Sequence, residues 1–162
     1  AVDKAVALLR AAGLADFSIQ AGGDLYVAGH RGDRPWRLGI ADPRAPDGAI
    51  FARVDLSDST FSTSGDYERS FIKDGVRYHH ILDPRTGQPA RLCRSVTIAA
   101  GSPVLADAVA KGVFILGPKK GLPLVEATEG AAAVVVDKDN HVVVSKRLEG
   151  KLKILFPPTD AP

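Results

Sequence analysis

Two adjacent histidines, His79 and His80, stand just before a tight turn at residues 83–87 (DPRTG). A neutral imidazole at the end of a strand can accept a proton from a hydroxyl group and so act as a general base. Because successive side chains of a strand point to opposite faces, at most one of the two rings can enter a given site. The competing interpretation is a pair of surface histidines beside a turn, and the residues alone leave both open.

Metal chemistry based on histidine and cysteine is disfavoured by the positions of these residues. His30 and His141 lie far along the chain from the histidine pair, and Cys93 is the single cysteine. A zinc site needs several such ligands at characteristic spacings, so zinc is weakly supported. A single cysteine also excludes an internal disulfide.

Two short segments of glycine and small polar residues are candidates for ligand contact. Gly22, Gly23 and Asp24 separate two strand-like runs, where consecutive glycines allow positive φ or the close approach of a ligand. Residues 63–67 (TSGDY) offer hydroxyls and backbone N–H groups of the kind that bind phosphate. Each segment has a simpler interpretation: a turn or β-bulge for the first, and the N-cap of a helix starting at Asp66 for the second.

Asp107 lies on a predicted helix with Lys111 one turn later. Such a pair is ordinarily a surface salt bridge worth a few tenths of a kcal/mol. Asp107 also precedes a strongly apolar helix face, and a buried carboxylate needs a cation or hydrogen bonds. A metal ion is therefore one option for its partner.

Hydrophobic periodicity predicts an α+β fold, a mostly antiparallel sheet with packed helices. Helices are expected at residues 1–12, followed by Gly13, at residues 104–116, stopped by Gly117 and Pro118, and at residues 122–128. Strands are expected at residues 17–20 (buried), 25–28, 36–40, 51–56, 95–100, 131–136 and 141–144. A hairpin loop is expected at residues 29–35, and a polar loop that becomes helical at residues 62–69.

Composition is that of an ordinary globular protein, with 45% hydrophobic residues, 25% charged residues and a formal net charge of +2. No basic stretch alternates with aromatic residues, so nucleic acid is not an expected partner. Residues 1–150 are expected to form one domain, and residues 151–162 a loose, proline-rich tail. The helical pattern begins at once, without an initiator Met or an N-cap residue, which indicates a chain cut from a longer one.

The order of the motifs resembles that of a known family. GGD (22–24), TSGDYER (63–69), HHILDPRTGQP (79–89), SVTIAA (95–100) and ADAVAKGVFILG (106–117) follow one another as in the C-terminal half of the ApbE family, the FAD:protein FMN transferases. The resemblance implies an ApbE-like, T-fold-like C-terminal portion. It also implies the activity: FMN is moved from FAD to a Thr or Ser hydroxyl of a partner redox protein, with magnesium assisting.

The resemblance implies roles for individual residues. His80 would be the catalytic base on the acceptor hydroxyl, with His79 pointing away, and Asp107 would ligate magnesium. The turn at residues 83–87 would fix the end of the histidine strand, and Ile81 would line the flavin site. The cofactor-binding residues that it implies are Gly22, Gly23, Asp24, Ser64, Gly65, Asp66, Tyr67, His80, Ile81, Thr86 and Gly87.

Two departures from the family pattern qualify these expectations. Lys111 stands where the family has a metal-ligating Thr. An ammonium group cannot ligate magnesium, so a weaker magnesium dependence is expected. The N-terminal half of the family, which contributes to the FAD pocket, is missing from the sequence and is an expected partner. The alternatives are a non-catalytic flavin-binding module and an FAD pyrophosphatase. By analogy with the family, the expected location is the periplasm, as a lipoprotein anchored in the inner membrane.

Overall fold

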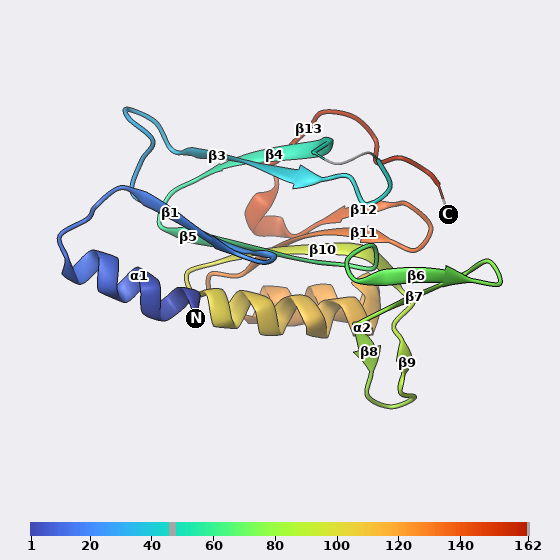
Figure 1. The fold of residues 1–162 in the computed structure, drawn as a ribbon. Coiled ribbons are helices and arrows are strands. Elements are labelled where there is room, and N and C mark those ends of the chain that lie inside the picture. The colour runs from blue at the N-terminus through green and yellow to red at the C-terminus, as the bar shows by residue number, and fades with distance from the viewer. Residues whose placement is uncertain (46–47, 162) are drawn as a thin grey trace.

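A computed structural model of the chain describes residues 1–45 and 48–161 and has three layers (Figure 1). Helices α1 (Val2–Ala11) and α2 (Pro103–Ala127) cover one face of a six-stranded antiparallel sheet. A three-stranded antiparallel sheet covers the other face. The α+β fold class with mostly antiparallel strands is confirmed.

The six-stranded sheet has the order β1–β2–β5–β10–β11–β12. Its strands are β1 (Phe17–Ala21), β2 (Asp24–Ala28), β5 (Ser59–Gly65), β10 (Cys93–Ala100), β11 (Ala132–Asp137) and β12 (Val142–Val144). The smaller sheet has the order β13–β4–β3, with strands β3 (Trp36–Ala41), β4 (Ile50–Leu56) and β13 (Lys153–Ile154). Two separate two-stranded ribbons are formed by β6 (Ser70–Lys73) with β7 (Val76–His79), and by β8 (Leu82–Asp83) with β9 (Gln88–Pro89). A short 3-10 helix, η1 (Lys146–Leu148), follows β12.

The two faces of the main sheet bury two different apolar clusters. Along β11, Ala133 and Val135 pack toward the helices, whereas Val134 and Val136 pack toward the smaller sheet. Because side chains alternate along a strand, a continuous apolar run is what a strand buried on both faces requires. Phe114 of α2 is fully buried in the helix-side cluster.

Helix α2 is broken at Gly117, whose φ of 73° and ψ of 170° lie outside the helical region. A left-handed residue without a Cβ is the ordinary way to end a helix, and Pro118 can begin the next one. The second half folds back so closely that a Cβ on Gly121 would lie 2.9 Å from Val113 Cα. The predicted stop at Gly117 and Pro118 is confirmed, and both helical halves cover the sheet.

Three local predictions were wrong. Strand β1 lies at the edge of the main sheet and is half-buried at best, not buried. Residues 29–35 close only a single antiparallel bridge, between Arg31 and Arg34, and do not join two paired strands, because β2 pairs with β1 and β5 whereas β3 pairs with β4 in the other sheet. The polar segment at residues 62–65 is part of strand β5, and Asp66 begins a turn instead of a helix. No N-cap is therefore formed there.

The buried hydroxyl groups of β5 explain how a Ser/Thr-rich segment can lie inside a sheet. Thr60 donates a hydrogen bond to Leu25 O at 2.8 Å, and Ser62 donates to the carboxylate of Asp24. The hydroxyls of Thr63 and Thr97 lie 2.9 Å apart. Paired hydroxyls lose little on burial, so this strand is stable without apolar side chains at those positions.

The segment expected to be a loose tail contacts the domain at several points. Strand β13 pairs with β4, and Leu155 N donates to Phe51 O at 2.8 Å. Further along, Thr159 donates from both its backbone N–H and its hydroxyl to Asp42 Oδ2, at 2.9 and 2.8 Å. Within residues 1–45 and 48–161, no helix combines the length and apolar character needed to cross a bilayer.

Candidate functional site

The largest cavity described lies between the β1–β2 turn, the end of β5 and the first turns of α2, and has a volume of about 680 Å³. This volume is in the range of small-molecule and cofactor sites. Most of the predicted site residues line it: Gly22, Gly23, Asp24, Ser64, Gly65, Tyr67, His80, Asp107 and Lys111. His80 and Asp107, which are far apart in sequence, thus reach one cavity.

Two glycines of the cavity wall lie too close to neighbouring atoms to carry a side chain. A Cβ on Gly23 would lie 2.7 Å from Thr63 O, and Thr63 N donates to Gly23 O at 3.1 Å. A Cβ on Gly65 would lie 2.4 Å from the ring of Tyr67. Both positions therefore need glycine for packing. The turn interpretation of the Gly22-Gly23 pair is confirmed, and the same turn contributes to the cavity.

The ammonium of Lys111 joins helix α2 to strand β5. Lys111 Nζ forms an ion pair with Asp107 one turn earlier and lies 3.5 Å from Ser64 Oγ. Both side chains of the ion pair are partly exposed to the cavity. One carboxylate oxygen of Asp107 and the hydroxyl oxygen of Ser64 thus contact the same ammonium group.

A magnesium ion at this point would need the same oxygens. Magnesium requires near-octahedral coordination by oxygen ligands, and Lys111 contacts both the carboxylate and the hydroxyl that could supply them. The arrangement of Asp107, Ser64 and Lys111 does not fit a magnesium ion while the ammonium holds this position. Asp24, the other predicted acidic residue of the wall, already accepts a hydrogen bond from Ser62.

The two adjacent histidines have different environments. His79 is buried: its Nε2 donates to Ala90 O at 2.8 Å, and its Nδ1 accepts from Ile81 N at 3.3 Å. His80 is exposed and lines the cavity, with its Nδ1 3.2 Å from the backbone oxygen of Glu68. Since a carbonyl oxygen can only accept, Nδ1 of His80 carries the proton and Nε2 is left as the basic nitrogen. His79, with both nitrogens engaged, serves the structure.

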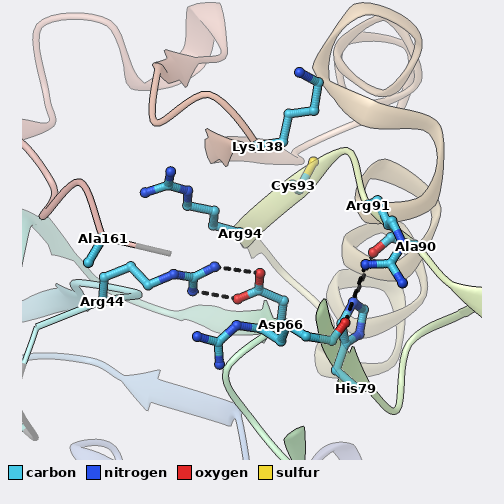
Figure 2. Close-up of a pocket in the computed structure, with 10 residues that line it drawn as sticks. Arg44, Asp66, His79, Ala90, Arg91, Cys93, Arg94, Lys138 and Ala161 are labelled. Carbon is cyan, nitrogen blue, oxygen red and sulfur yellow. Dashed lines mark hydrogen bonds and ion pairs between the residues drawn. The ribbon is translucent and has the colours of Figure 1, made fainter. Parts of the chain in front are cut away.

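Asp66 does not face this cavity, although the sequence places it beside Gly65 and Tyr67. Its two carboxylate oxygens each accept a hydrogen bond of 2.7 Å from Arg44, in a bidentate ion pair (Figure 2). The two side chains are 12% and 8% exposed. Asp66 therefore acts as a buried counter-ion of Arg44.

Three further predicted residues lie elsewhere. Ile81 is buried in the helix-side apolar cluster, among residues of β10 and α2. Thr86 and Gly87 form the exposed turn between β8 and β9, where Thr86 Oγ1 accepts from Gln88 N at 3.2 Å and Gly87 has a φ of 67°. None of the three lines the cavity. Asp83 caps this turn by accepting from Arg85 N at 2.9 Å.

Tyr67 and the two residues that follow it also line the cavity. Burial raises the pKa of Tyr67 to about 12, so its phenol remains a neutral hydrogen-bond donor at physiological pH. Glu68 and Arg69 also line the cavity and were not among the predicted site residues. They directly follow Tyr67 in the TSGDYER motif, and this position could have identified them as site residues from the sequence.

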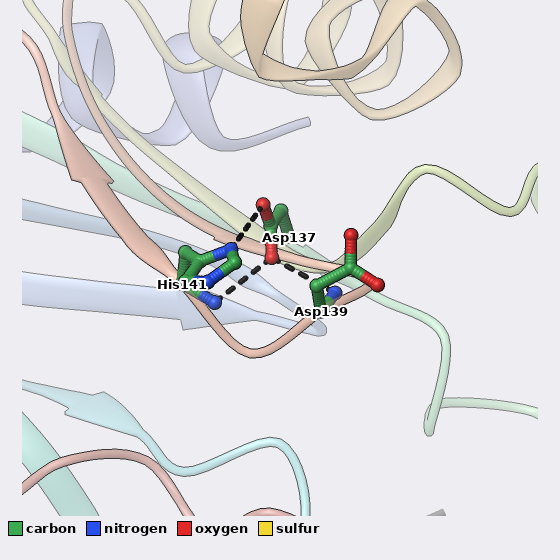
Figure 3. A group of neighbouring side chains, drawn as sticks. All are labelled: Asp137, Asp139 and His141. Atoms are coloured by element: carbon green, nitrogen blue, oxygen red, sulfur yellow. Dashed lines mark hydrogen bonds and ion pairs between the residues drawn. The ribbon is translucent and has the colours of Figure 1, made fainter.

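A group of metal-binding residue types lies apart from the cavity, in the β11–β12 turn. Asp137, Asp139 and His141 lie close together there (Figure 3). Asp137 Oδ1 accepts from Asp139 N at 2.9 Å and from His141 N at 2.8 Å, and the other oxygen lies 3.2 Å from the His141 ring. Lys138 pairs with Asp139. These bonds fold the predicted hairpin turn, which accounts for the cluster.

Comparison with known proteins assigns the chain to one family. The family model described as "ApbE family" matches residues 1–136, and the chain belongs to this family. It is 36% identical to a "FAD:protein FMN transferase" of Rhodobacter capsulatus over 94% of this chain and 29% of that protein. A protein of the same name from Treponema pallidum is also 36% identical, over 94% of this chain and 45% of that protein.

Solved structures agree with this assignment. The ApbE protein of Thermotoga maritima is 38% identical and superimposes with a TM-score of 0.75, over 84% of this chain and 44% of that one. The flavin transferase ApbE of Vibrio cholerae is 29% identical with a TM-score of 0.78, over 93% of this chain and 48% of that one. The chain thus spans less than half the length of these relatives.

Proposed function

We propose that this chain is the C-terminal part of a FAD:protein FMN transferase, in which the cavity holds FAD and His80 activates the hydroxyl of the acceptor protein. The observation that carries the proposal is the convergence of His80, Asp107 and Lys111 on one cavity. The names of the relatives support it, because they are FAD:protein FMN transferases.

In the proposed reaction, the hydroxyl oxygen of an acceptor Thr or Ser attacks the phosphorus atom on the FMN side of the pyrophosphate. The new P–O bond joins FMN to the acceptor, the bond to the bridging oxygen breaks, and AMP leaves with that oxygen. The proton of the hydroxyl passes to Nε2 of His80. A positioned general base of this kind contributes about 10²- to 10⁴-fold.

We further propose that Lys111 provides part of the charge compensation for the phosphates, so that magnesium is needed less than where a ligating side chain holds this position. Transfer of a phosphoryl group depends on positive charge near its oxygens. Lys111 carries one such charge on a packed helix, at the wall of the cavity. The same proposal includes assistance by magnesium and a Thr or Ser hydroxyl of a partner redox protein as the acceptor. It also includes an N-terminal half that completes the FAD pocket. A periplasmic, membrane-anchored location belongs to the proposal too, and the family resemblance is its support.

The ion pair of Lys111 with Asp107 also favours a second candidate, a flavin-binding module without transfer activity. A single ammonium already neutralised by a carboxylate offsets less charge than a divalent ion does. In that case the cavity would hold FAD and leave it intact.

The test is to incubate the full-length protein with FAD and an acceptor protein that carries the Thr or Ser. We expect FMN to become covalently attached to the acceptor, detected by its flavin fluorescence after denaturing electrophoresis. Free FMN and AMP without labelled acceptor would identify a pyrophosphatase instead. FAD that binds, as measured by quenching of its fluorescence, and is recovered unchanged would identify the binding module.

A further inference from the structure

A second, smaller cavity lies where Asp66 follows β5 and where β10 begins with Cys93 and Arg94, and has a volume of about 200 Å³ (Figure 2). It shares no lining residue with the candidate site. Cationic side chains from five separate segments converge on it. They are Arg44 after β3, Arg77 on β7, Arg91 after β9, Arg94 on β10 and Lys138 after β11.

Of Arg44, Arg91, Arg94 and Lys138 in this arginine-lined cavity, Arg91 is the one that has no carboxylate partner among the described residues. Asp66 is the one carboxylate among its described lining residues, and it is paired with Arg44. Asp160 and Asp139 pair with Arg94 and Lys138 from outside the lining. Like charges gathered in a partly desolvated cavity repel one another strongly, so this arrangement favours an anion.

The other polar side chains among the described lining residues, His79 and Cys93, add no negative charge. Burial lowers the pKa of His79, whose Nε2–H already donates to Ala90 O, so the ring is neutral. Burial also raises the pKa of Cys93 to about 12, so its thiol stays protonated.

Two arginines have donor capacity that the protein does not use. Arg91 stacks over the ring of Tyr78, 5.8 Å from its centroid, and donates to Arg77 O at 3.3 Å. Among the described residues, no carboxylate lies within ion-pair distance of Arg91. The Nε of Arg44 is buried and has no hydrogen-bond partner in the described part of the chain. Its side chain is only 8% exposed, and a buried donor without a partner is costly.

We propose that the arginine-lined cavity binds a phosphate group, with Arg91 as a principal ligand. The planar guanidinium group offers paired N–H donors that match two oxygens of a phosphate. The volume suits a small anion or the phosphate end of a nucleotide. The site goes beyond the proposed transfer function and does not depend on it.

The test uses isothermal titration calorimetry of inorganic phosphate and, separately, AMP, with sodium chloride at equal ionic strength as the blank. We expect phosphate to bind at one site, and Arg91→Gln to weaken binding about tenfold, as expected for the loss of one charge-assisted contact. Arg91→Lys keeps the charge but loses the paired N–H donors of the guanidinium group. Its affinity for phosphate should lie between those of the unmodified protein and Arg91→Gln. Arg37→Gln removes an exposed arginine of β3 outside the cavity and should leave the affinity unchanged.

The variant Lys111→Gln distinguishes binding at this cavity from binding at the candidate functional site. It should leave the affinity for phosphate unchanged. AMP binding more tightly than phosphate, with the same sensitivity to Arg91, would identify a nucleotide as the source of the group, whereas equal affinities would identify the free ion. Heat no larger than that of chloride would overturn the proposal. So would binding that is lost in Lys111→Gln and kept in a folded Arg91→Gln, with circular dichroism as the check on folding.

Discussion

Lys111 and Ser64 meet where helix α2 crosses the end of strand β5, with 3.5 Å between the ammonium nitrogen and the hydroxyl oxygen. The same ammonium pairs with Asp107. One side chain thus contacts both of the oxygen-bearing groups of α2 and β5 that could ligate a metal ion at this point.

Lys111→Thr should increase the magnesium requirement for FMN transfer. The substitution removes the tethered charge and frees the oxygens of Asp107 and Ser64, so the ion becomes the main source of positive charge. The measurement is a titration of magnesium against transfer to the acceptor. Lys119→Thr, at an exposed position of the second half of α2, is the matched control and should behave as the unmodified protein. An equal magnesium requirement in the unmodified protein and Lys111→Thr would contradict the prediction.

His80→Ala and His79→Ala should differ in what they damage. The first should lower the transfer rate by about 10²- to 10⁴-fold with little change in stability, because the exposed ring of His80 contributes chemistry and not packing. The second should lower the free energy of unfolding by about 1–3 kcal/mol or more, because the buried oxygen of Ala90 loses its donor. Transfer assays and urea unfolding measure the two effects. Equal loss of activity in two folded variants would refute the assignment of the base to His80.

Stability should fall as the pH drops below about 6.5, and His79 should account for part of the fall. Burial lowers the pKa of His79 in the folded state below its ordinary value of 6.5. As the pH falls through 6.5, the unfolded chain takes up a proton that the folded protein does not. The unfolded state is thereby stabilised, and the free energy of unfolding decreases. His79→Gln keeps a hydrogen-bond donor but cannot titrate. Its free energy of unfolding should depend less on pH in this range, and an unchanged dependence would count against the prediction.

The ion pair between Arg44 and Asp66 should matter far more for stability than that between Arg37 and Asp55. Removing one partner of a buried pair leaves an uncompensated charge, so Arg44→Ala should cost about 3–5 kcal/mol. Arg37→Ala breaks a pair whose side chains are nearly half exposed and should cost about 0–1 kcal/mol. Urea unfolding measures both. If Asp66→Ala in the Arg44→Ala background costs as much as Asp66→Ala alone, the two residues do not act as a pair.

Much of the fold follows from periodicity in the sequence. Long apolar patterns predict strands β10 and β11 and the first half of α2. The Gly117-Pro118 pair predicts the break in the helix. Strand β5 was missed because most of its buried side chains are hydroxyls, such as that of Thr60, which donates to Leu25 O, and Phe61 is its one large apolar side chain. The false hairpin at residues 29–35 has a different cause. Local turn signals do not reveal that the next strand joins another sheet.

The candidate site was predictable in its membership and less so in its orientation. The order of the motifs predicted that His80, Asp107 and the Gly22-Gly23 turn lie in one site, and all of them line the same cavity. The turn after β5 and the link between β7 and β8 decide the rest: Asp66 and Ile81 each adjoin a cavity residue in sequence, yet one faces Arg44 and the other the helix-side cluster. Adjacency in a motif therefore does not assign a side chain to a site.

The ribbon of β6 and β7 pairs only with itself among the described strands and projects from the body of the molecule (Figure 1). Asp107 and Ser64 belong to the packed helix and the main sheet, whereas His80 directly follows this outlying ribbon. A bending motion of the ribbon would change the distance from the imidazole to the carboxylate without breaking any backbone pairing of the six-stranded sheet. Amide exchange in β6 and β7 should therefore be faster than in β5 and β10, which pair with strands on both sides.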